Sequence, residues 1–409
     1  MWKPSMILRA TVAAATCGWM LAVAARQPLL GQAGPPDAPV GQGGQTNGML
    51  SQSEFDAARV AFEARETPET GLGPVFNAPS CVACHRNPAT GGGSQVTVLR
   101  AGHFDGATFF EHPGGSLIQD HAIAPEIQEH VLPGNEVRAT RISLSTLGDG
   151  FVEAIDDRTL LDIQRSQPLT MRGEAVTVAV LEAPGQTRIG RFGWKSQHAS
   201  LLSFSADAYL NEMGITNRLL RVENTSNGNS VAAFDRVPDP APNGEDSSSD
   251  LDKFAAFMRA TRAPAPDAAA MRAADAQQGQ ALFAAVGCAT CHTATITTAP
   301  AGQVINGGTF VVPAALGGKT IHPYSDFLLH DVGTGDGIVQ NGGASSRNKL
   351  RTAPLWGLRS RTRLMHDGQS LSVFDAVMRH GGEAASVVRA FSTLRDDQKL
   401  ALLAFLNAQ

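Results

Sequence analysis

The chain has 409 residues, with 33 Lys and Arg against 38 Asp and Glu, so its formal net charge at pH 7 is −5. This balance argues against nucleic acid or an anionic membrane surface as a partner. Charged residues make up only 17% of the chain, and glycine and proline are plentiful. That composition predicts a loop-rich globular protein, and the length leaves room for two domains.

The first 25 residues have the pattern of a signal peptide. Lys3 and Arg9 precede an apolar stretch, and the small residues at 22–24 offer a cleavage site. The apolar stretch is too short and too rich in alanine to favour a permanent membrane span, although an uncleaved anchor is an alternative. We expect residues 1–25 to be removed on export and no membrane contact beyond them. Residues 26–50 are rich in Gly, Pro and Gln, which predicts a disordered spacer.

A helix is expected after Ser51 or Ser53, and the motif C-x-x-C-H follows it at residues 81–85 and recurs at 288–292. The motif is typical of c-type haem attachment, in which two thiols bond to the porphyrin and the imidazole ligates the iron. A zinc half-site or a thioredoxin-like pair is the alternative, but neither requires a histidine after each cysteine pair. The residues expected to hold two covalent haems are Cys81, Cys84 and His85, and Cys288, Cys291 and His292.

The compartment follows from the same residues. Apart from Cys17 in the leader, every cysteine belongs to a haem motif, so no pair is left for a disulfide. Haem is attached to such motifs outside the cytoplasm. The leader and the motifs therefore agree on a periplasmic location.

Four histidines between residues 99 and 134 recur at intervals of nine, a spacing typical of neither a helix nor a strand. We interpret them as loop or surface histidines. An iron bound by His85 nevertheless needs a second ligand or an open face, and this is the only histidine cluster nearby. Its members are His103, His112, His121 and His130.

Further along the chain, residues 176–181 and 187–192 predict a β-hairpin around a Pro-Gly turn, and residues 200–213 predict a helix. Residues 237–266 have the composition of a linker with a short helix. A helix over residues 271–287 runs into the second motif, and a last helix begins after Thr393.

These elements predict a mainly α fold with two cytochrome c-like haem domains. The N-terminal domain would span residues 51–236 and contain the small β-hairpin insertion. The C-terminal domain would span residues 267–409, after the linker at 237–266.

A specific set of short stretches is spread over residues 55–408: G-P-V-F-N (73–77), R-F-G-W-K (191–195), E-M-G-I-T (212–216), L-L-H-D (328–331), R-T-A-P-L-W-G (351–357), H-D-G (366–368) and H-G-G-E-A (380–384). Together they resemble the di-haem oxidoreductases, a family also named for thiol oxidation. That family is similar to bacterial di-haem cytochrome c peroxidases and to a related tryptophan-modifying di-haem enzyme. Nothing in these residues selects a thiol as the substrate.

The resemblance implies two catalytic residues. The peroxidases have a Trp between their haems, a Gln ten residues later, and a Glu before Met. Trp194 and Glu212 stand at the Trp and Glu positions, but the Gln position falls on Phe204. A phenylalanine cannot hydrogen-bond peroxide, so this departure puts full peroxidase activity in doubt.

The resemblance also implies the distal iron ligands. In the peroxidases the second haem takes a Met fourteen residues after the His of H-D-G, and here that position is His380, with Met378 and Met365 as nearby alternatives. For the first haem, His103 is the nearest match to a displaceable His, with His112 second and an open or water-bound iron as the alternative. The peroxidases also carry calcium between their domains, for which the sequence has no readable signature.

The expected function is a periplasmic di-haem oxidoreductase. Electrons would come from a small periplasmic carrier protein, cross through Trp194, and act on peroxide or another small redox substrate at the haem on His85, with Glu212 over it. The alternative is a non-catalytic electron-transfer protein with both irons six-coordinate. Glu212 and Trp194 favour the enzyme, whereas Phe204 favours the relay.

Overall fold

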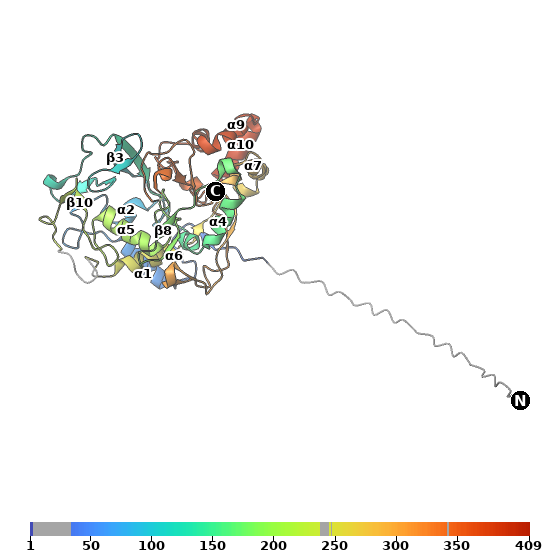
Figure 1. The fold of residues 1–409 in the computed structure, drawn as a ribbon, viewed down its shortest axis with the longest axis horizontal. Helices are drawn as coiled ribbons and strands as arrows, with labels where there is room; N and C mark the ends of the chain where they lie inside the picture. Colours follow the sequence, from blue (N-terminus) through green and yellow to red (C-terminus); the bar gives the residue numbers. More distant parts are fainter. Residues whose placement is uncertain (3–33, 238–244, 247, 342) are drawn as a thin grey trace. The chain divides into compact units, whose positions relative to one another are not determined.

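The computed structural model describes residues 1–2, 34–237, 245–246, 248–341 and 343–409, and Pro35–Gln409 form one compact unit (Figure 1). Residues 3–33, which contain nearly all of the predicted signal peptide and the start of the predicted spacer, lie outside the described residues. Within the described ranges, no helix is both long enough and apolar enough to cross a membrane.

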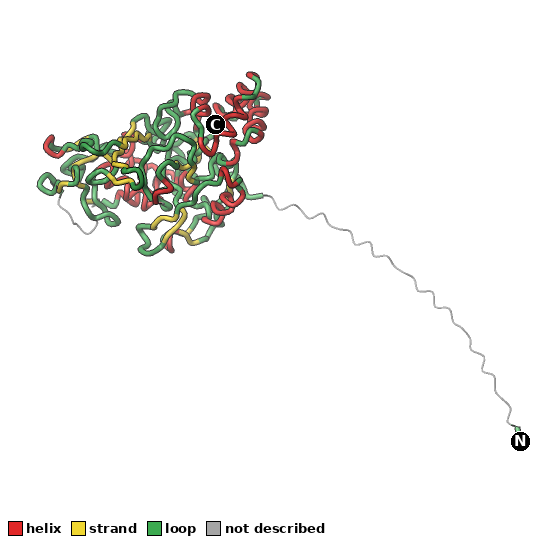
Figure 2. Tube along the Cα trace, turned by 45° about the horizontal axis from the view of Figure 1, so that its top comes forward, coloured by secondary structure: helices red, strands yellow, loops and turns green. Residues whose placement is uncertain are grey.

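The expectation of a mainly α fold with one hairpin insertion is wrong. The structure is 32% helix and 16% strand, and its strands are spread over many small sheets (Figure 2). The α-helices are α1 (Gln52–Glu63), α2 (Cys81–Cys84), α3 (Asp149–Glu153), α4 (Asp157–Ser166), α5 (Leu201–Met213), α6 (Asp250–Ala260), α7 (Ala274–Ala285), α8 (Val373–Met378), α9 (Ala385–Ser392) and α10 (Asp396–Asn407).

Most of the sheets pair two strands of two or three residues. So short a strand has too few residues to show an alternation of apolar and polar side chains. The sequence therefore predicted only one of these pairs, the hairpin at 176–181 and 187–192, which the structure contains. These pairs are β1 (Val40–Gly41) with β13 (Ala263–Pro264), β2 (Val75–Phe76) with β6 (His121–Ala122), β8 (Thr177–Ala179) with β9 (Thr187–Ile189), β10 (Thr225–Ser226) with β11 (Asn229–Ser230), β14 (Ile296–Thr297) with β17 (Thr320–Ile321), β15 (Val304–Ile305) with β16 (Phe310–Val311), and β18 (Leu329–His330) with β19 (Leu350–Arg351).

The largest sheet lies in the segment that the sequence assigned to histidine-bearing loops. Strand β3 (Thr97–Phe104) pairs with β7 (Val137–Ile142), and also with β4 (Phe109–Glu111) and β5 (Leu117–Ile118), always antiparallel. Alternate side chains of a strand point to opposite faces. The position of each β3 residue therefore decides which face of the sheet its side chain occupies.

Helices α1, α5 and α6 pack together in one part of the unit (Figure 1). The predicted start of α1 is confirmed, because Ser51 forms a capping box with Glu54. The predicted helix at 200–213 is confirmed as α5, and the Ser200 side chain accepts from two backbone N–H groups of its first turn. Phe62 packs edge-on against Phe254, which anchors α1 on α6 beside the first motif.

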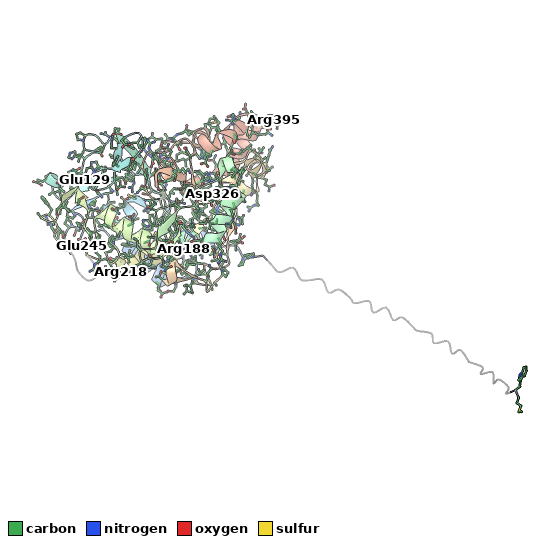
Figure 3. The ribbon with its side chains drawn as sticks, in the orientation of Figure 1. Glu129, Arg188, Arg218, Glu245, Asp326 and Arg395 are labelled. Atoms are coloured by element: carbon green, nitrogen blue, oxygen red, sulfur yellow. The ribbon has the colours of Figure 1, made fainter. Side chains whose placement is uncertain are left out.

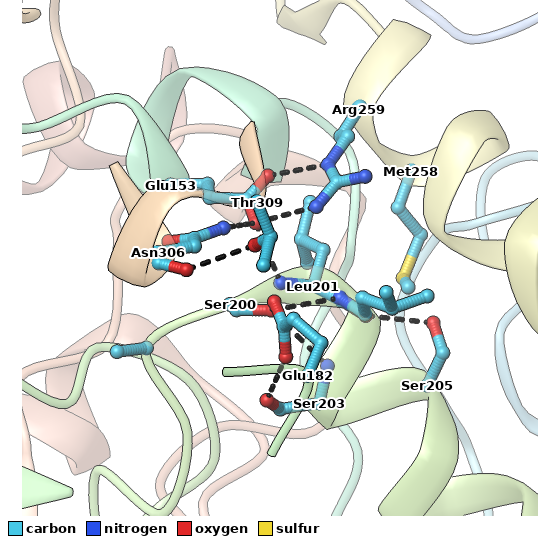
Figure 4. Close-up of polar contacts among 12 residues, drawn as sticks. Glu153, Glu182, Ser200, Leu201, Ser203, Ser205, Met258, Arg259, Asn306 and Thr309 are labelled. Atoms are coloured by element: carbon cyan, nitrogen blue, oxygen red, sulfur yellow. Dashed lines mark hydrogen bonds and ion pairs between the residues drawn. The ribbon is translucent and has the colours of Figure 1, made fainter. Parts of the chain in front are cut away.

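A buried ionic group fixes the beginning of α5 (Figure 4). Glu153 is fully buried and accepts from the Leu201 backbone N–H at 2.8 Å and from the Asn306 side chain at 2.9 Å. Its other oxygen lies 2.6 Å from Arg259 Nε of α6. Burial alone would raise the pKa of Glu153, but the ion pair with Arg259 holds it below its ordinary value. The carboxylate thus fixes α5 relative to α6, and α5 carries site residues.

The described part of the predicted spacer is ordered. Strand β1 pairs in parallel with β13, and Asn47 is buried with its side chain donating to the Arg259 and Thr261 carbonyls. Those contacts correct the spacer prediction for residues 35–50. They also place the helix at 250–260, which the sequence assigned to the linker, inside the N-terminal helix cluster.

Helices α7 and α10 cross closely in another part of the unit (Figure 1). The crossing depends on Gly279, because a Cβ there would meet the Ala401 carbonyl oxygen and the Phe405 side chain. Phe283 of α7 packs edge-on against Phe405 of α10, with their ring centroids 5.4 Å apart. The helix expected after Thr393 begins later than predicted, at Asp396.

We expect Gly279→Val to lower the free energy of unfolding by about 3 kcal/mol, at the upper end for overpacked cores, since a backbone carbonyl must move. Urea unfolding followed by far-ultraviolet circular dichroism measures this change. Gln278→Ala, at an exposed position of the same helix, is the matched control. Equal unfolding midpoints for the two variants would contradict the close crossing.

Candidate haem sites

The first motif lies on α2 and forms one wall of a cavity, which we call the N-terminal cavity. His85 Nδ1 lies 3.1 Å from the Gly92 carbonyl oxygen, and burial lowers the pKa of His85. An Nδ1–H that donates to a carbonyl leaves a neutral ring with a free lone pair on Nε2, as in a metal-ligating histidine. Burial also raises the pKa of Cys81 to about 12 and that of Cys84 to about 11. Such neutral thiols are unlike the low-pKa thiol of a redox Cys pair.

The second motif repeats this arrangement in a second cavity, the C-terminal cavity. His292 Nδ1 lies 2.8 Å from the Tyr324 carbonyl oxygen, and burial lowers the pKa of His292 to about 4. Burial raises the pKa of Cys288 to about 12. Phe283 of α7 and Cys291 also line this cavity. The α7–α10 crossing therefore supports the second motif as α1 and α6 support the first.

Trp194 lies in the wall between the two cavities. It lines both of them, together with residues 142–145 and Arg351. The Trp194 Nε1–H donates to the Ile142 carbonyl at 2.7 Å, and its own carbonyl accepts from the Arg351 backbone N–H at 2.8 Å. Trp194 thus places an aromatic ring, held by these hydrogen bonds, between the two cavities.

The neighbour of Trp194, Lys195, is fully buried and ties this wall to a distant loop. Its ammonium lies 2.9 Å from Asp336 Oδ1 and donates to the Ser346 and Lys349 carbonyls, each at 2.8 Å. Asp336 also pairs with buried Arg141 at 2.7 Å. These contacts hold the backbone of the separating wall in one position.

His380 lies where a second ligand for the C-terminal haem is needed. It lines the same cavity as His292, and its Nδ1 lies 2.7 Å from the Ala376 carbonyl oxygen, which again leaves Nε2 free. Of the two methionine alternatives, Met365 lines the cavity, whereas Met378 is 41% exposed and is not among the lining residues.

His103 lies outside the N-terminal cavity, which corrects its prediction as a ligand. It is partly exposed, its Nδ1 is 2.8 Å from Glu136 Oε2, and its ring stacks on Phe110. The cause is strand parity, because Val98 and Arg100 of β3 line the cavity and an odd-numbered residue points to the other face. His112, the second choice, is buried elsewhere and accepts from the Leu132 N–H.

The N-terminal cavity instead presents carboxylates from α5. Glu212 lines it and accepts from the Asn77 side chain at 2.8 Å. Burial raises the pKa of Glu212, and Arg100 and Asn77 only partly oppose the rise. Asp207 lines the same cavity, and there His198 and Arg100 overcome the effect of burial and hold the pKa of Asp207 below its ordinary value. A third carboxylate, Asp149 of α3, also lines this cavity, and burial raises its pKa to about 7. Carboxylates with opposite shifts in one cavity are typical of an acid–base site.

Phe204 also lines this cavity, at the position where the peroxidases have Gln. Its ring stacks on Phe192, with the centroids 5.9 Å apart, and His198 packs on it as well. Among the described residues that line the N-terminal cavity, His85 is the only histidine. The two cavities therefore differ in their histidines: His380 lines the C-terminal cavity together with His292, whereas the described lining of the N-terminal cavity contains no second histidine.

The residues of both cavities fit a haem. Each cavity combines two cysteines, an imidazole with a free Nε2, and largely apolar walls. Arg351 lines both cavities, and burial lowers its pKa only to about 10, so it stays cationic at neutral pH and suits haem carboxylates. Arg361 and Arg363 add further cations to the C-terminal cavity.

His330 belongs to the wall of the C-terminal cavity and makes a buried ionic group with Asp326 (labelled in Figure 3) and Glu383. Burial alone would lower the pKa of His330, but hydrogen bonds to these partners raise it to about 12. In the part of the chain that the structure describes, Cys291, Asp326 and His330 are the only close group of potential metal ligands. Sulfur and nitrogen do not suit calcium, whose binding stays untested.

Two cavities that each offer a cysteine pair and a free imidazole nitrogen define a redox protein with two haems. The chain belongs to the di-haem oxidoreductase family: the family described as "Di-haem oxidoreductase, putative peroxidase" matches residues 118–409. The family predicted from the short stretches is thereby confirmed. The match includes the second motif, Trp194, Glu212 and His380, whereas the first motif precedes it.

Two solved structures are similar at low identity. Hydrazine synthase of Kuenenia stuttgartiensis shares 14% identity over 100% of both chains, with a TM-score of 0.40. A MauG-like protein associated with microbial copper homeostasis shares 15% identity over 96% of this chain and 95% of that chain, also with a TM-score of 0.40. No curated protein matches this chain.

Sequence reasoning missed Arg100 and Asp207, which line the N-terminal cavity, and Asn77, which donates to Glu212. Arg100 lies in a strand that the sequence did not reveal. Asp207 was detectable as a second carboxylate on the predicted helix at 200–213, five residues before Glu212. Asn77 belongs to a stretch that carried the family resemblance, but its bond to Glu212 joins residues 135 apart in the chain.

Proposed function

We propose that this protein is an exported, periplasmic di-haem oxidoreductase whose haems are attached through thioether bonds. Cys81 and Cys84 would hold the N-terminal haem, and Cys288 and Cys291 the C-terminal haem. The C-x-x-C-H motifs, the cysteine pair that lines each cavity and the leader-like residues 1–25 support this assignment.

The observation that carries the proposed activity is the difference between the two cavities. The C-terminal cavity places His380 in the same cavity as His292, whereas the described lining of the N-terminal cavity contains carboxylates and no second histidine. An iron with two imidazoles keeps its geometry in both redox states and transfers electrons. The N-terminal site is therefore the reactive one, and the C-terminal site accepts electrons from a small carrier protein.

Peroxide or another small oxidant is the proposed substrate, and a haem with an open position supplies the reacting iron when bound. Reduction of hydrogen peroxide to two waters consumes two electrons and two protons. Glu212 takes the proton from the near oxygen and delivers it to the leaving oxygen, and Asn77 orients its carboxylate. Phe204 and Phe192 exclude water on one side. Trp194 lies between the donor and acceptor sites.

Electron paramagnetic resonance of the oxidised and half-reduced protein tests the proposal. A high-spin ferric signal in either state, together with turnover of peroxide, is the expected result. Phe204, at the position where the peroxidases have Gln, favours the alternative of a non-catalytic electron-transfer protein in which both irons are six-coordinate. Low-spin signals only, with no peroxide turnover, would establish that alternative and exclude the enzyme.

We expect His380→Met to raise the reduction potential of the C-terminal haem by on the order of 100 mV, a fraction of the ~0.8 V range that axial ligands set. The reason is that a thioether donates less to ferric iron than an imidazole does. Potentiometric titration followed by absorption measures the shift. His130→Met, at an exposed position far along the chain from both motifs, should leave both potentials unchanged. An unchanged C-terminal potential in His380→Met would exclude His380 as a ligand.

A further inference from the structure

A third cavity adjoins the N-terminal cavity and reaches the protein surface. Exposed residues line its outer part, including Glu111, Thr177 and Ala179. Arg100, Gln197 and Asp207 line both this cavity and the N-terminal cavity, so the two spaces meet at these side chains. We call these three residues the throat.

The throat is built from side chains with defined partners. Arg100 Nη1 donates to Ser116 Oγ at 3.0 Å, while its buried Nε has no hydrogen-bond partner among the described residues. Asp207 accepts from the Asn211 side chain at 2.9 Å and lies 3.4 Å from His198 Nε2. The throat therefore offers fixed donors and acceptors in a partly desolvated place.

We propose that the third cavity is the passage by which a small, uncharged, hydrogen-bonding substrate of the peroxide class reaches the N-terminal site through the throat. The inference rests on the proposed function and adds to it a route and a substrate class. Glu212, on whose pKa the charges of Arg100 and Asp207 act, lines only the N-terminal cavity. The passage therefore leads toward the acid–base site.

The charges of the throat select a neutral substrate. An anion would meet the Asp207 carboxylate, and a cation would meet the Arg100 guanidinium, each at a desolvation cost in a confined space. A neutral molecule with O–H donors and oxygen acceptors can exchange hydrogen bonds with Arg100, Gln197 and Asp207 in turn. The polar side chains of the throat disfavour an apolar hydroperoxide, because it cannot replace the hydrogen bonds that they make with water.

Narrowing the passage tests the proposal. Ala179→Trp places an indole in the outer wall, on a strand where an aromatic residue is well tolerated. We expect it to slow the binding of hydrogen cyanide to the oxidised holoprotein at least about tenfold, because binding must then await movement of the indole. The dissociation rate should fall by the same factor, which leaves Kd unchanged. Stopped-flow absorption of the Soret band measures both rates.

Thr177→Trp, in the same wall, should behave like Ala179→Trp. Agreement between the two variants shows that the slower binding does not come from a folding defect in one of them. Ala107→Trp, exposed in the turn after β3 and outside the passage lining, should bind cyanide as the wild type does. In turnover, the two wall variants should lose more kcat/KM with tert-butyl hydroperoxide than with hydrogen peroxide. A changed Kd with an unchanged association rate would indicate a distorted site instead of a blocked route and would contradict the passage.

The two proposals fail in different ways. Wild-type association rates in both wall variants would overturn the passage and leave the open N-terminal haem intact. A wild-type holoprotein that binds no cyanide would overturn the proposed function, and the passage with it.

Discussion

Replacing both cysteines of either motif is expected to remove one covalent haem and to abolish peroxide reduction driven by an electron-carrier protein. The Cys81→Ala, Cys84→Ala variant would keep the C-terminal haem but lose the reactive site. The Cys288→Ala, Cys291→Ala variant would keep the reactive site but lose the route by which electrons reach it. In both variants we expect the rate of peroxide reduction to fall to the background rate. The reason is that, in the proposed function, the N-terminal cavity holds the reactive haem and the C-terminal cavity holds the haem that accepts electrons.

Mass spectrometry and the pyridine haemochrome spectrum count the haems, and each variant should retain half of the wild-type content. The two variants are matched controls for one another. Only the variant that keeps Cys81 and Cys84 should still give a high-spin ferric signal, and chemical reductants should restore part of its turnover. If the mass of the denatured wild-type protein equals that of the polypeptide alone, covalent attachment of haem is contradicted.

Glu212→Gln is expected to lower kcat/KM for hydrogen peroxide by about 10²–10⁴-fold, the usual contribution of a general acid–base group. The amide can still accept from Asn77, so the geometry should persist while proton transfer is lost. Stopped-flow reaction of the holoprotein with peroxide measures the change. Glu126→Gln, at an exposed site without such a role, should retain the wild-type rate.

The pH dependence of the rate of peroxide reduction shows whether Glu212 transfers protons or only supports the structure. Burial raises the pKa of Glu212 above its ordinary value, and the carboxylate must be ionised to take the first proton. The wild-type rate should therefore fall as the pH drops through this raised pKa. The pKa of Asp207 is held low, so Asp207 cannot produce the same limb. An acidic limb that persists unchanged in Glu212→Gln would exclude Glu212 as its source and would assign the limb to Asp149, which lines the same cavity and whose pKa burial raises to about 7.

Local features were predictable because neighbouring residues encode them. Each C-x-x-C-H motif carries its two cysteines and its histidine within five residues. Ser51 and Ser200 begin their helices through bonds to the next few backbone N–H groups. Trp194 and Glu212 were found from motifs, and the structure places both in the N-terminal cavity.

The fold class and the rest of the site depended on contacts between distant residues. Sheets of two-residue strands leave no pattern in the sequence. The pairing of β3 with β7 decides that Arg100 lines the N-terminal cavity while His103 lies outside it. The sequence by itself thus identified the family and predicted haem as the cofactor and the two motif histidines as its proximal ligands. Only the tertiary structure decided which other side chains line each cavity with the motif histidine. The cavity walls are formed by segments that lie more than a hundred residues apart in the chain.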